Sequence, residues 1–311
     1  MKLRRLGTSG LKVSAIGLGC NNFGMRIDQD QTTRVVDAAL DAGINFFDTA
    51  DIYGGSKSET YLGVALQGKR DQAIIASKFA NPMGEGPYRR GGSRRYIVEA
   101  VEASLRRLNT DRIDLYQMHV PDADTPIEET LRALDDLVRA GKVLYLGNSN
   151  FSGWQIADAD WVSRSGGLER FVSAQNHFSL LERAVAREVL PACERFGLGF
   201  LPYFPLASGL LSGKYTRGEA PAEGTRMAAM GARAASALND ANFDKVEKLE
   251  AWAKDQGRSL LELAFAWLLG HPGVSSVIAG ATSEAQIAAN AKGADWDLTP
   301  AQMAEVSTLV R

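Results

Sequence analysis

The sequence predicts an α/β fold of the (β/α)8 TIM-barrel class, and two observations indicate it. Apolar runs rich in Ile, Val and Phe alternate with amphipathic helical patterns along most of the chain, which is typical of a parallel sheet covered by helices. Residues that can handle protons follow several of these runs instead of gathering at one point of the chain. That spread favours a barrel over a doubly wound sheet, and no glycine-rich dinucleotide fingerprint follows any predicted strand.

The elements are predicted in the following order. Residues 2–14 form a small β-hairpin that turns at Gly7-Thr8-Ser9-Gly10. The eight barrel strands are the apolar runs near residues 15–19, 44–48, 73–79, 113–119, 143–148, 171–176, 198–204 and 275–279. The helices between them have one apolar face each and lie near residues 30–42, 57–67, 94–107, 126–140, 153–164, 183–196 and 241–256.

Local signals mark some of the helix ends, and two stretches depart from the alternation. Ser93 is a plausible N-cap for the helix near 94–107, and Gly141 ends the helix near 126–140. Residues 217–240 are rich in Ala and Gly and lack periodicity, which predicts a functional loop. The stretch from Leu260 to Leu269, followed by His271-Pro272-Gly273, is typical of an extra helix before the last strand. Because no linker or compositional break occurs, we expect residues 1–311 to form a single domain.

Composition excludes several classes of protein. Hydrophobic residues make up 45% and charged residues 23% of the chain, which describes a soluble globular protein. The formal net charge of −2 provides no field for nucleic acid or an anionic membrane. The basic run at residues 89–95 lacks interleaved aromatic residues and is better explained as a solvated loop. Residues 1–20 faintly resemble a leader, but polar residues interrupt the apolar segment. With two cysteines, no disulfide framework is expected, and we predict a cytoplasmic protein.

Four side chains suited to proton transfer follow successive predicted strands: Asp48, Tyr53, Lys78 and His119. The carboxyl ends of barrel strands meet at one face, so we expect these side chains to lie together. A phenol can bond a carbonyl oxygen and stay protonated at neutral pH, which makes Tyr53 the predicted proton donor. Lys78 would lower the pKa of that phenol, and Asp48 would pair with Lys78 and keep it charged. His119 would orient the substrate oxygen.

Each of these residues also has an ordinary structural explanation. A tyrosine after a strand more often packs than reacts, an Asp or Lys at a strand end is usually a cap or a solvated charge, and a single histidine is often a satisfied core residue. Only the combination of the four favours catalysis. With 3 histidines in the chain and none at metal-ligand spacing, no metal site is expected.

At this point the sequence resembles the aldo-keto reductases over nearly its whole length. The matching pieces are Phe47-Asp48-Thr49-Ala50 with Tyr53-Gly54, Ser77-Lys78, His119, Gly147-Asn148-Ser149-Asn150, Gln175, Tyr203-Phe204-Pro205-Leu206 and Gly209-Leu210-Leu211-Ser212-Gly213-Lys214-Tyr215. The resemblance implies a barrel that binds a nicotinamide cofactor and reduces small aldehydes or ketones. It favours NADP(H), with NAD(H) as the alternative.

The same resemblance implies which residues bind the cofactor. They are Ser149, Asn150, Gln175 and Tyr203 at the nicotinamide, Leu206, Ser208, Gly209, Leu211 and Lys214 at the pyrophosphate, and Gly280, Thr282, Ser283, Gln286 and Asn290 at the adenosine. Two positions depart from the family pattern, Phe204 in place of a serine and Asn148 in place of a small residue. Residues 280–284 lack the cations that often hold a 2′-phosphate, and Arg226 would substitute if its loop folds over.

Two alternatives remain open at the level of sequence. Some proteins that resemble this chain are cofactor-sensing regulatory subunits of a protein complex. The other alternative is a barrel lyase or isomerase that forms a Schiff base on Lys78. Candidate apolar walls for a substrate are Phe23, Phe79, Met83, Val120, Phe151 and Trp154. The sequence does not indicate the physiological substrate, the direction of reaction or the oligomeric state.

Overall fold

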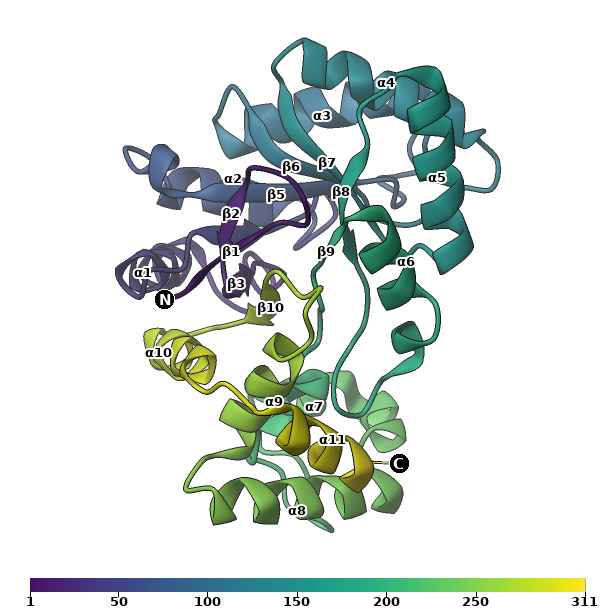
Figure 1. The fold of residues 1–311 in the computed structure, drawn as a ribbon. Coiled ribbons are helices and arrows are strands. Elements are labelled where there is room, and N and C mark those ends of the chain that lie inside the picture. Colours follow the sequence, from purple (N-terminus) through teal and green to yellow (C-terminus); the bar gives the residue numbers. More distant parts are fainter. Residues whose placement is uncertain (311) are drawn as a thin grey trace.

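The computed structural model describes residues 1–310, and within them it has a sheet of eight parallel strands with helices around it (Figure 1). The strands follow one another in space in the order β10-β3-β4-β5-β6-β7-β8-β9. Their bounds are β3 Ile16–Gly19, β4 Phe46–Asp48, β5 Ile74–Phe79, β6 Ile113–Met118, β7 Val143–Ser149, β8 Phe171–Gln175, β9 Gly199–Phe200 and β10 Val277–Gly280. Each predicted barrel strand is confirmed, although β9 is much shorter than expected.

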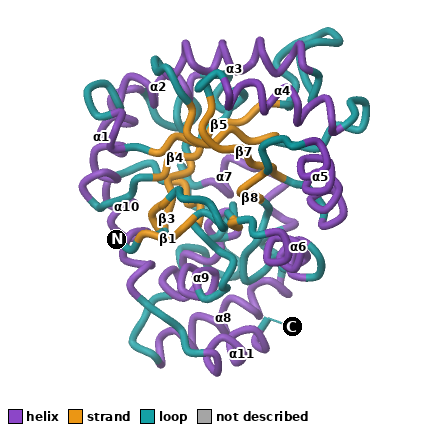
Figure 2. Tube along the Cα trace, turned by 45° about the horizontal axis from the view of Figure 1, so that its top comes forward, coloured by secondary structure: helices purple, strands orange, loops and turns teal. Residues whose placement is uncertain are grey.

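Contacts beyond β9 bring the two edges of this sheet together. Parallel bridges join Phe200 to Val274 and Tyr203 to Ile278, and the Ile278 amide donates to the Pro202 carbonyl at 2.9 Å. The expected (β/α)8 barrel is thereby confirmed. Figure 2 shows the strands in the middle of the molecule with the helices outside them.

The predicted N-terminal hairpin consists of β1 (Leu3–Arg5) and β2 (Lys12–Ser14), paired antiparallel. Leu6 and Val13 from this hairpin are fully buried against Phe46, Leu115 and other apolar side chains of the barrel strands. The hairpin therefore supplies part of a small apolar core that is separate from the larger core between sheet and helices. Because this apolar surface is removed from water, it stabilises the hairpin on the barrel.

The predicted helices are confirmed with small shifts at their ends, except the one near 183–196, of which only the second part is a helix. They are α1 Gln29–Asp41, α2 Lys57–Ala65, α3 Arg94–Leu108, α4 Ile127–Arg139, α5 Gly153–Gly166, α6 Val189–Phe196, α8 Asp240–Asp255 and α9 Leu260–Leu269. Ser93 caps α3 by accepting a hydrogen bond from the Tyr96 amide. Gly141, with φ 71°, follows the last turn of α4 as expected.

Three parts of the chain differ from expectation. The helix predicted near 183–196 is a 3-10 turn over Ala184–Ala186 followed by α6. The segment 217–240 contains a short helix, α7 (Arg226–Met230), and a 3-10 helix over Gly231–Ser236. Two further helices, α10 (Glu284–Lys292) and α11 (Pro300–Leu309), complete the described chain and are additional to the predicted elements.

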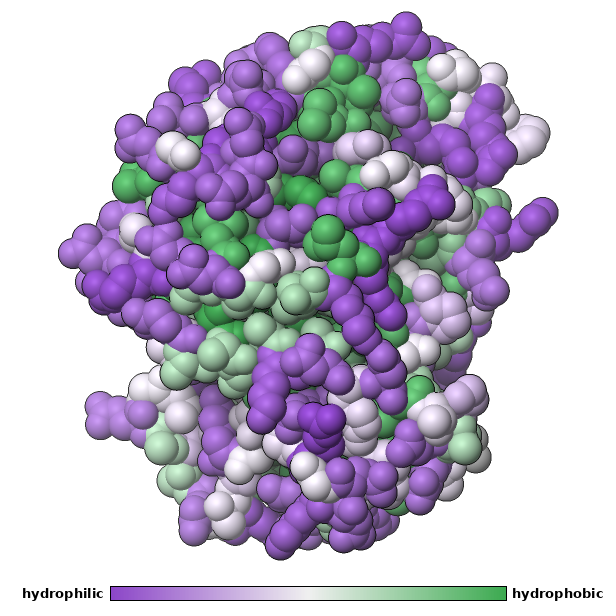
Figure 3. All heavy atoms as spheres, turned by 60° about the vertical axis from the view of Figure 1, so that its left-hand side comes forward, coloured by the Kyte–Doolittle hydropathy of each residue, from purple (hydrophilic) through white to green (hydrophobic). Residues whose placement is uncertain are grey.

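The surface is mainly hydrophilic on the side seen in Figure 3, with smaller apolar areas between the polar ones. Among residues 1–310, no helix is both long and apolar enough to cross a membrane. The described residues also contain no group of three or more His, Cys, Asp or Glu side chains arranged to hold a metal ion.

Candidate active site

The four proton-handling residues lie together at the carboxyl ends of three neighbouring strands. Asp48 is the last residue of β4, Lys78 lies near the end of β5, and His119 directly follows β6. Tyr53 stands on the turn between β4 and α2. Gly54 allows that turn, because it has φ 58° and a side chain there would meet the Phe23 carbonyl at 2.5 Å. The local sequence therefore places the phenol beside the strand ends.

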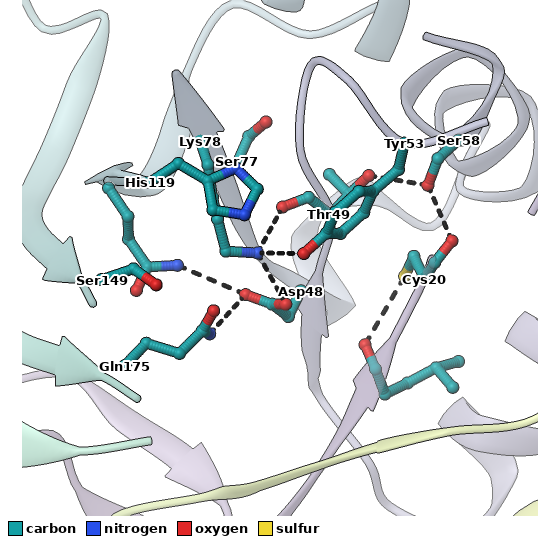
Figure 4. Close-up of polar contacts among 12 residues, drawn as sticks. Cys20, Asp48, Thr49, Tyr53, Ser58, Ser77, Lys78, His119, Ser149 and Gln175 are labelled. Atoms are coloured by element: carbon teal, nitrogen blue, oxygen red, sulfur yellow. Dashed lines mark hydrogen bonds and ion pairs between the residues drawn. The ribbon is translucent and has the colours of Figure 1, made fainter. Parts of the chain in front are cut away.

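Lys78 is the centre of the polar network (Figure 4). Its ammonium donates to Asp48 Oδ2 at 2.7 Å, to the Thr49 carbonyl at 2.8 Å and to the Tyr53 hydroxyl at 3.3 Å. The side chain is 0% exposed. Burial acts to lower the pKa of Lys78, but Asp48 and then Tyr53 outweigh it, so the pKa is raised. The lysine therefore stays protonated, which disfavours the alternative of a Schiff base on Lys78.

Asp48 is held on its other oxygen by two amides. Gln175 donates to Oδ1 at 2.7 Å and Gln117 at 3.3 Å. A buried carboxylate needs this kind of compensation, because an unpaired charge in the interior is costly. Asp48 thus holds Lys78 in one position and keeps it charged.

The structure corrects one expectation about Tyr53. Lys78 was expected to lower the pKa of the phenol, and it does favour the phenolate. However, burial is the larger effect, and the Asp48 charge adds to it, so the pKa of Tyr53 is raised above its usual value of 10. The sequence did not reveal how deeply this turn is enclosed. Tyr53 is therefore a protonated acid at neutral pH.

His119 lies against Tyr53 with the two ring centroids 5.7 Å apart and the planes nearly perpendicular. Burial and the nearby Lys78 charge lower its pKa to about 3. The imidazole is therefore neutral and can donate one hydrogen bond without carrying charge. Its Nδ1 is buried and has no hydrogen-bond partner among the described residues. This favours the tautomer with the proton on Nε2. A buried N–H group without a hydrogen-bond partner is rarer than a buried acceptor without one.

Tyr53 and His119 open into a cleft of about 730 Å³. Twelve of the predicted cofactor-binding residues line it: Ser149, Asn150, Gln175, Tyr203, Leu206, Ser208, Gly209, Lys214, Gly280, Thr282, Gln286 and Asn290. Leu211 and Ser283 do not, because Leu211 is fully buried and the Ser283 hydroxyl caps α10. Lys78 lies behind the cleft wall rather than in it. One cleft therefore joins most of the predicted cofactor residues to the proposed proton donor.

Several of the polar groups in the cleft are already hydrogen-bonded to one another. Asn150 donates to the His119 carbonyl at 2.9 Å and to Ser149 Oγ at 3.1 Å, and it accepts from the Tyr203 hydroxyl at 2.8 Å. Gln175 uses its amide nitrogen on Asp48. The groups left to hold an external amide are therefore the Ser149 hydroxyl proton and the Gln175 carbonyl oxygen.

Unusual backbone conformations occur along the same cleft. Asn150, Phe204, Ala207 and Ser208 have positive φ values of 61°, 53°, 46° and 58°. Such conformations cost free energy outside glycine and persist only where the surroundings enforce them. Three of the four belong to the loop from Phe204 to Lys214, which lines the middle of the cleft. The backbone of this loop is therefore held in an unusual conformation, which shapes the wall of the cleft.

Sequence reasoning missed part of the cleft, and the apolar side chains that it named as substrate walls do not line it. Asn21, Asn22 and Arg26 from the loop after β3 line it, as do Gly224 and Thr225. None of the six residues expected as substrate walls does; Phe23 and Phe79 are buried in the core, and Trp154 is 66% exposed. Of the two departures from the family pattern, Phe204 lines the cleft and Asn148 does not.

Comparison with known proteins agrees with this architecture. Residues 15–311 match the model of the "Aldo/keto reductase family". The chain is 38% identical to a "Probable voltage-gated potassium channel subunit beta" of Oryza sativa subsp. japonica, over 100% of this chain and 97% of that protein. It is also 38% identical to the "Uncharacterized oxidoreductase YrpG" of Bacillus subtilis (strain 168), over 96% and 92%. A "Versiconal hemiacetal acetate reductase" of Aspergillus parasiticus is 35% identical, over 88% of this chain and 86% of that protein.

The barrel, the site at its carboxyl end and these relatives define the class of the protein, which is an oxidoreductase built on a parallel barrel. Within that class, the chain belongs to the aldo/keto reductase family.

Proposed function

We propose that this protein is an NAD(P)H-dependent reductase that converts a small aldehyde or ketone to an alcohol, with Tyr53 as general acid. The observation that supports this best is the buried Lys78 ammonium, which bonds both Asp48 and the Tyr53 hydroxyl beside the cleft. A phenol in such a position can deliver a proton to an oxygen in the cleft.

In this mechanism each residue has a defined role. A reduced nicotinamide supplies the hydride that the carbonyl carbon gains. Tyr53 gives its phenolic proton to the carbonyl oxygen and becomes a phenolate, which later takes up one proton from the solvent. Lys78 stabilises that phenolate by its charge, and Asp48 keeps Lys78 in place. His119, which is neutral, donates a hydrogen bond that orients the carbonyl oxygen.

The cleft has groups that suit each part of a dinucleotide. Ser149 and Gln175 offer a donor and an acceptor for a carboxamide, and the Tyr203 ring offers a flat surface beside them. Gly209 lies in the loop from Phe204 to Lys214, where its φ of 98° favours glycine and Lys214 supplies positive charge. Thr282, Gln286 and Asn290 line the far end. We propose that these residues hold the cofactor.

We propose NADP(H) as the preferred cofactor, with NAD(H) as the alternative. Three cations line the cleft, Arg26, Lys214 and Arg226, which suits a ligand with several phosphate charges. The lining residues from β10 and α10 include no cation, and the Glu284 carboxylate nearby is bonded to Gln31 and lies 3.5 Å from Arg34. The support for a 2′-phosphate site is therefore weaker than the support for the nicotinamide end.

The proposed function is tested by replacing Tyr53 with Phe. We expect the wild type to consume NADPH with an aromatic aldehyde, and Tyr53→Phe to lose about 100- to 10,000-fold in kcat, the usual contribution of a general acid. NADPH binding, followed by fluorescence titration, should be unchanged. Tyr88→Phe is the matched control, because Tyr88 is 47% exposed and lies outside the cleft. Full activity of Tyr53→Phe would overturn the assignment.

A second candidate function is a cofactor-sensing regulatory subunit. It is favoured by the names of two relatives, since proteins of Oryza sativa and Arabidopsis thaliana at 38% and 37% identity are named as probable potassium channel subunits. Partner capture that changes between NADPH and NADP⁺, by a protein that turns over no carbonyl compound, would support this alternative. We further propose that residues 1–311 form one domain and that the protein works in the cytoplasm, where its two free, buried cysteines would stay reduced.

A further inference from the structure

One of the three histidines, His177, lies beside the cleft without lining it. It comes two residues after Gln175, the last residue of β8, and Tyr203 follows β9. These two strands are neighbours in the sheet (Figure 1), and a parallel bridge joins His177 to Tyr203 beyond their ends. Side chains of paired residues lie next to each other on one side of a sheet. The backbone therefore sets the imidazole beside the phenol ring.

The imidazole of His177 stacks on the Tyr203 ring. The two ring centroids are 5.5 Å apart, and the angle between the ring planes is 12°. Tyr203 lines the cleft and His177 does not, so the imidazole covers the side of the phenol ring that is turned away from the cleft. Stacked aromatic pairs attract each other beyond the effect of the buried area alone. The ring that we propose to lie beside the nicotinamide is thus supported from behind by a second ring.

Phe204 completes this group of rings. Its ring is nearly perpendicular to the other two, with centroid distances of 5.1 Å to Tyr203 and 5.6 Å to His177. Such edge-to-face contacts are favourable. The backbone of Phe204 has φ 53°, a conformation that persists only where the surroundings hold it. We call the three packed rings of His177, Tyr203 and Phe204 the aromatic support.

The Tyr203 hydroxyl is held separately from the ring face. It donates to Asn150 Oδ1 at 2.8 Å, and Asn150 donates to the His119 carbonyl at 2.9 Å. This bond fixes one end of the phenol but not its tilt, because the hydroxyl oxygen lies on the axis about which the ring turns. Stacking against His177 opposes that turning. The two contacts together define the plane of the Tyr203 ring.

His177 gives this support without adding a charge. Burial lowers the pKa of His177, although the Glu182 charge acts to raise it. The Nε2 atom of His177 is buried and has no hydrogen-bond partner among the described residues. A neutral imidazole with these ring contacts is suited to packing rather than to proton transfer. His177 thereby differs from His119, which opens into the cleft.

We propose that His177 is a positioning residue for the nicotinamide, because it holds the Tyr203 ring in the plane against which the nicotinamide packs. The inference rests on the proposed function, in which Tyr203 offers that flat surface. Hydride transfer requires the nicotinamide to face the carbonyl carbon in one orientation. A ring whose plane is fixed beforehand need not be ordered when the cofactor binds. His177 would thus act on cofactor affinity and on rate without touching cofactor or substrate.

The test compares NADPH with 2′-phospho-ADP-ribose, which is the same molecule without its nicotinamide. In His177→Ala we expect the Kd for NADPH to rise about 3- to 10-fold, the range expected for one aromatic pair. The Kd for 2′-phospho-ADP-ribose should stay unchanged, and kcat with an aromatic aldehyde should fall. His177→Phe keeps a flat ring at this position and should restore NADPH binding. Isothermal titration calorimetry measures both ligands. If NADH binds more tightly, NADH and ADP-ribose are the pair compared.

Two further variants complete the design. Tyr203→Ala removes the ring that His177 supports, so adding His177→Ala to it should weaken NADPH binding no further. His271→Ala is the matched control, because this imidazole also packs against aromatic rings, but those of Phe178 and Trp267 instead of Tyr203. It should leave the Kd of both ligands unchanged.

Three results would overturn the inference while the reductase function stands. They are an unchanged Kd for NADPH in His177→Ala, an equal loss of affinity for NADPH and 2′-phospho-ADP-ribose, and no recovery in His177→Phe. A wild type that binds NADPH but reduces no aldehyde would overturn the proposed function alone, because the binding measurements still test His177. If the wild type bound neither NADPH nor NADH, the proposed function and this inference would both fall.

Discussion

Asp51 is a second buried acid in the catalytic region, two residues before Tyr53. It is 1% exposed, accepts a hydrogen bond from the Tyr96 hydroxyl at 3.3 Å, and its Oδ1 has no partner among the described residues. Its backbone amide donates to the Lys78 carbonyl at 3.3 Å. Burial, and next the neighbouring Glu59 charge, raise the pKa of Asp51 from 3.8 to about 7. The turn that carries Tyr53 is therefore anchored by a group that titrates near neutral pH.

This carboxyl should make stability depend on pH. The folded protein holds the Asp51 proton more tightly than the unfolded chain, so folding is favoured by this group at low pH and loses that contribution as pH rises towards 7. Between pH 5 and pH 8, we expect the wild type to lose about 3 kcal/mol more than Asp51→Asn in the free energy of unfolding. Urea unfolding at the two pH values measures this. Asp41→Asn, a change at an exposed carboxylate, should behave like the wild type.

Residue identities were easier to predict than residue environments. The order of Asp48, Tyr53, Lys78 and His119 after successive strands was enough to place them together. The direction of the Tyr53 pKa was not, because it depends on the balance between burial and the Lys78 charge. The burial of individual apolar side chains was also not predictable from the residue types, and the residues named as substrate walls do not line the cleft. Phe79, which directly follows Lys78 in β5, faces the core because neighbouring residues of a strand point to opposite sides.

At the scale of elements, the N-terminal hairpin depends on a close backbone contact at its turn. Gly7 has φ 57°, and a side chain there would meet the Gly197 carbonyl at 2.4 Å and the Gly199 amide at 2.5 Å. The Thr8 amide donates to the same Gly197 carbonyl at 3.0 Å. This turn therefore ties the hairpin to the start of β9 on the barrel.

Gly7→Ala should weaken that attachment. It combines a strained φ with a backbone clash, so we expect a loss of more than about 1 kcal/mol in the free energy of unfolding. Gly10→Ala, in the same turn, is the control. Its nearest neighbour would be the Tyr145 hydroxyl at 3.8 Å, an ordinary contact, and its φ is not positive. Equal stability of the two variants in chemical unfolding would show that the contact at Gly7 is unimportant.

The elements that sequence patterns missed have local physical reasons. Residues 183–196 have helical composition, but Pro191 would lose its hydrogen bond and clash with the Arg187 carbonyl in a continuous helix. The helix instead begins at Val189, which places Pro191 in its first turn. The short helix α7 lies in a segment without apolar periodicity. Thr225 caps it, and the Met227 amide donates to the Tyr215 hydroxyl, contacts that no periodic pattern records.

At the scale of the whole molecule, cofactor binding should couple to global stability. The cleft is lined by β3, the central loop from Phe204 to Lys214, the segment with α7, and α10. A ligand that contacts all of them binds only the folded protein and not the unfolded chain. At a free concentration of about 100 times its Kd, it should add about 2.7 kcal/mol to the free energy of unfolding.

This coupling also tests the proposed cofactor preference. At equal concentrations, NADPH should raise the unfolding midpoint more than NADH does, and Tyr53→Phe should show the same ranking because it leaves the proposed cofactor walls intact. Thermal unfolding followed by circular dichroism measures both. A larger rise with NADH would reverse the preference and agree with the absence of cations on the cleft walls from β10 and α10.

The hairpin that covers one end of the barrel has a consequence for the order of steps in the catalytic cycle. Leu6 and Val13 seal that end with apolar side chains, and Lys78 and Asp48, on the inner side of Tyr53, are themselves buried. On the proposed mechanism, the proton that Tyr53 gives away must then return by the same opening through which the alcohol departs. Tyr53 would then be reprotonated only after the product has left. A slowly released alcohol would therefore delay the reprotonation of Tyr53 as well as the binding of the next substrate.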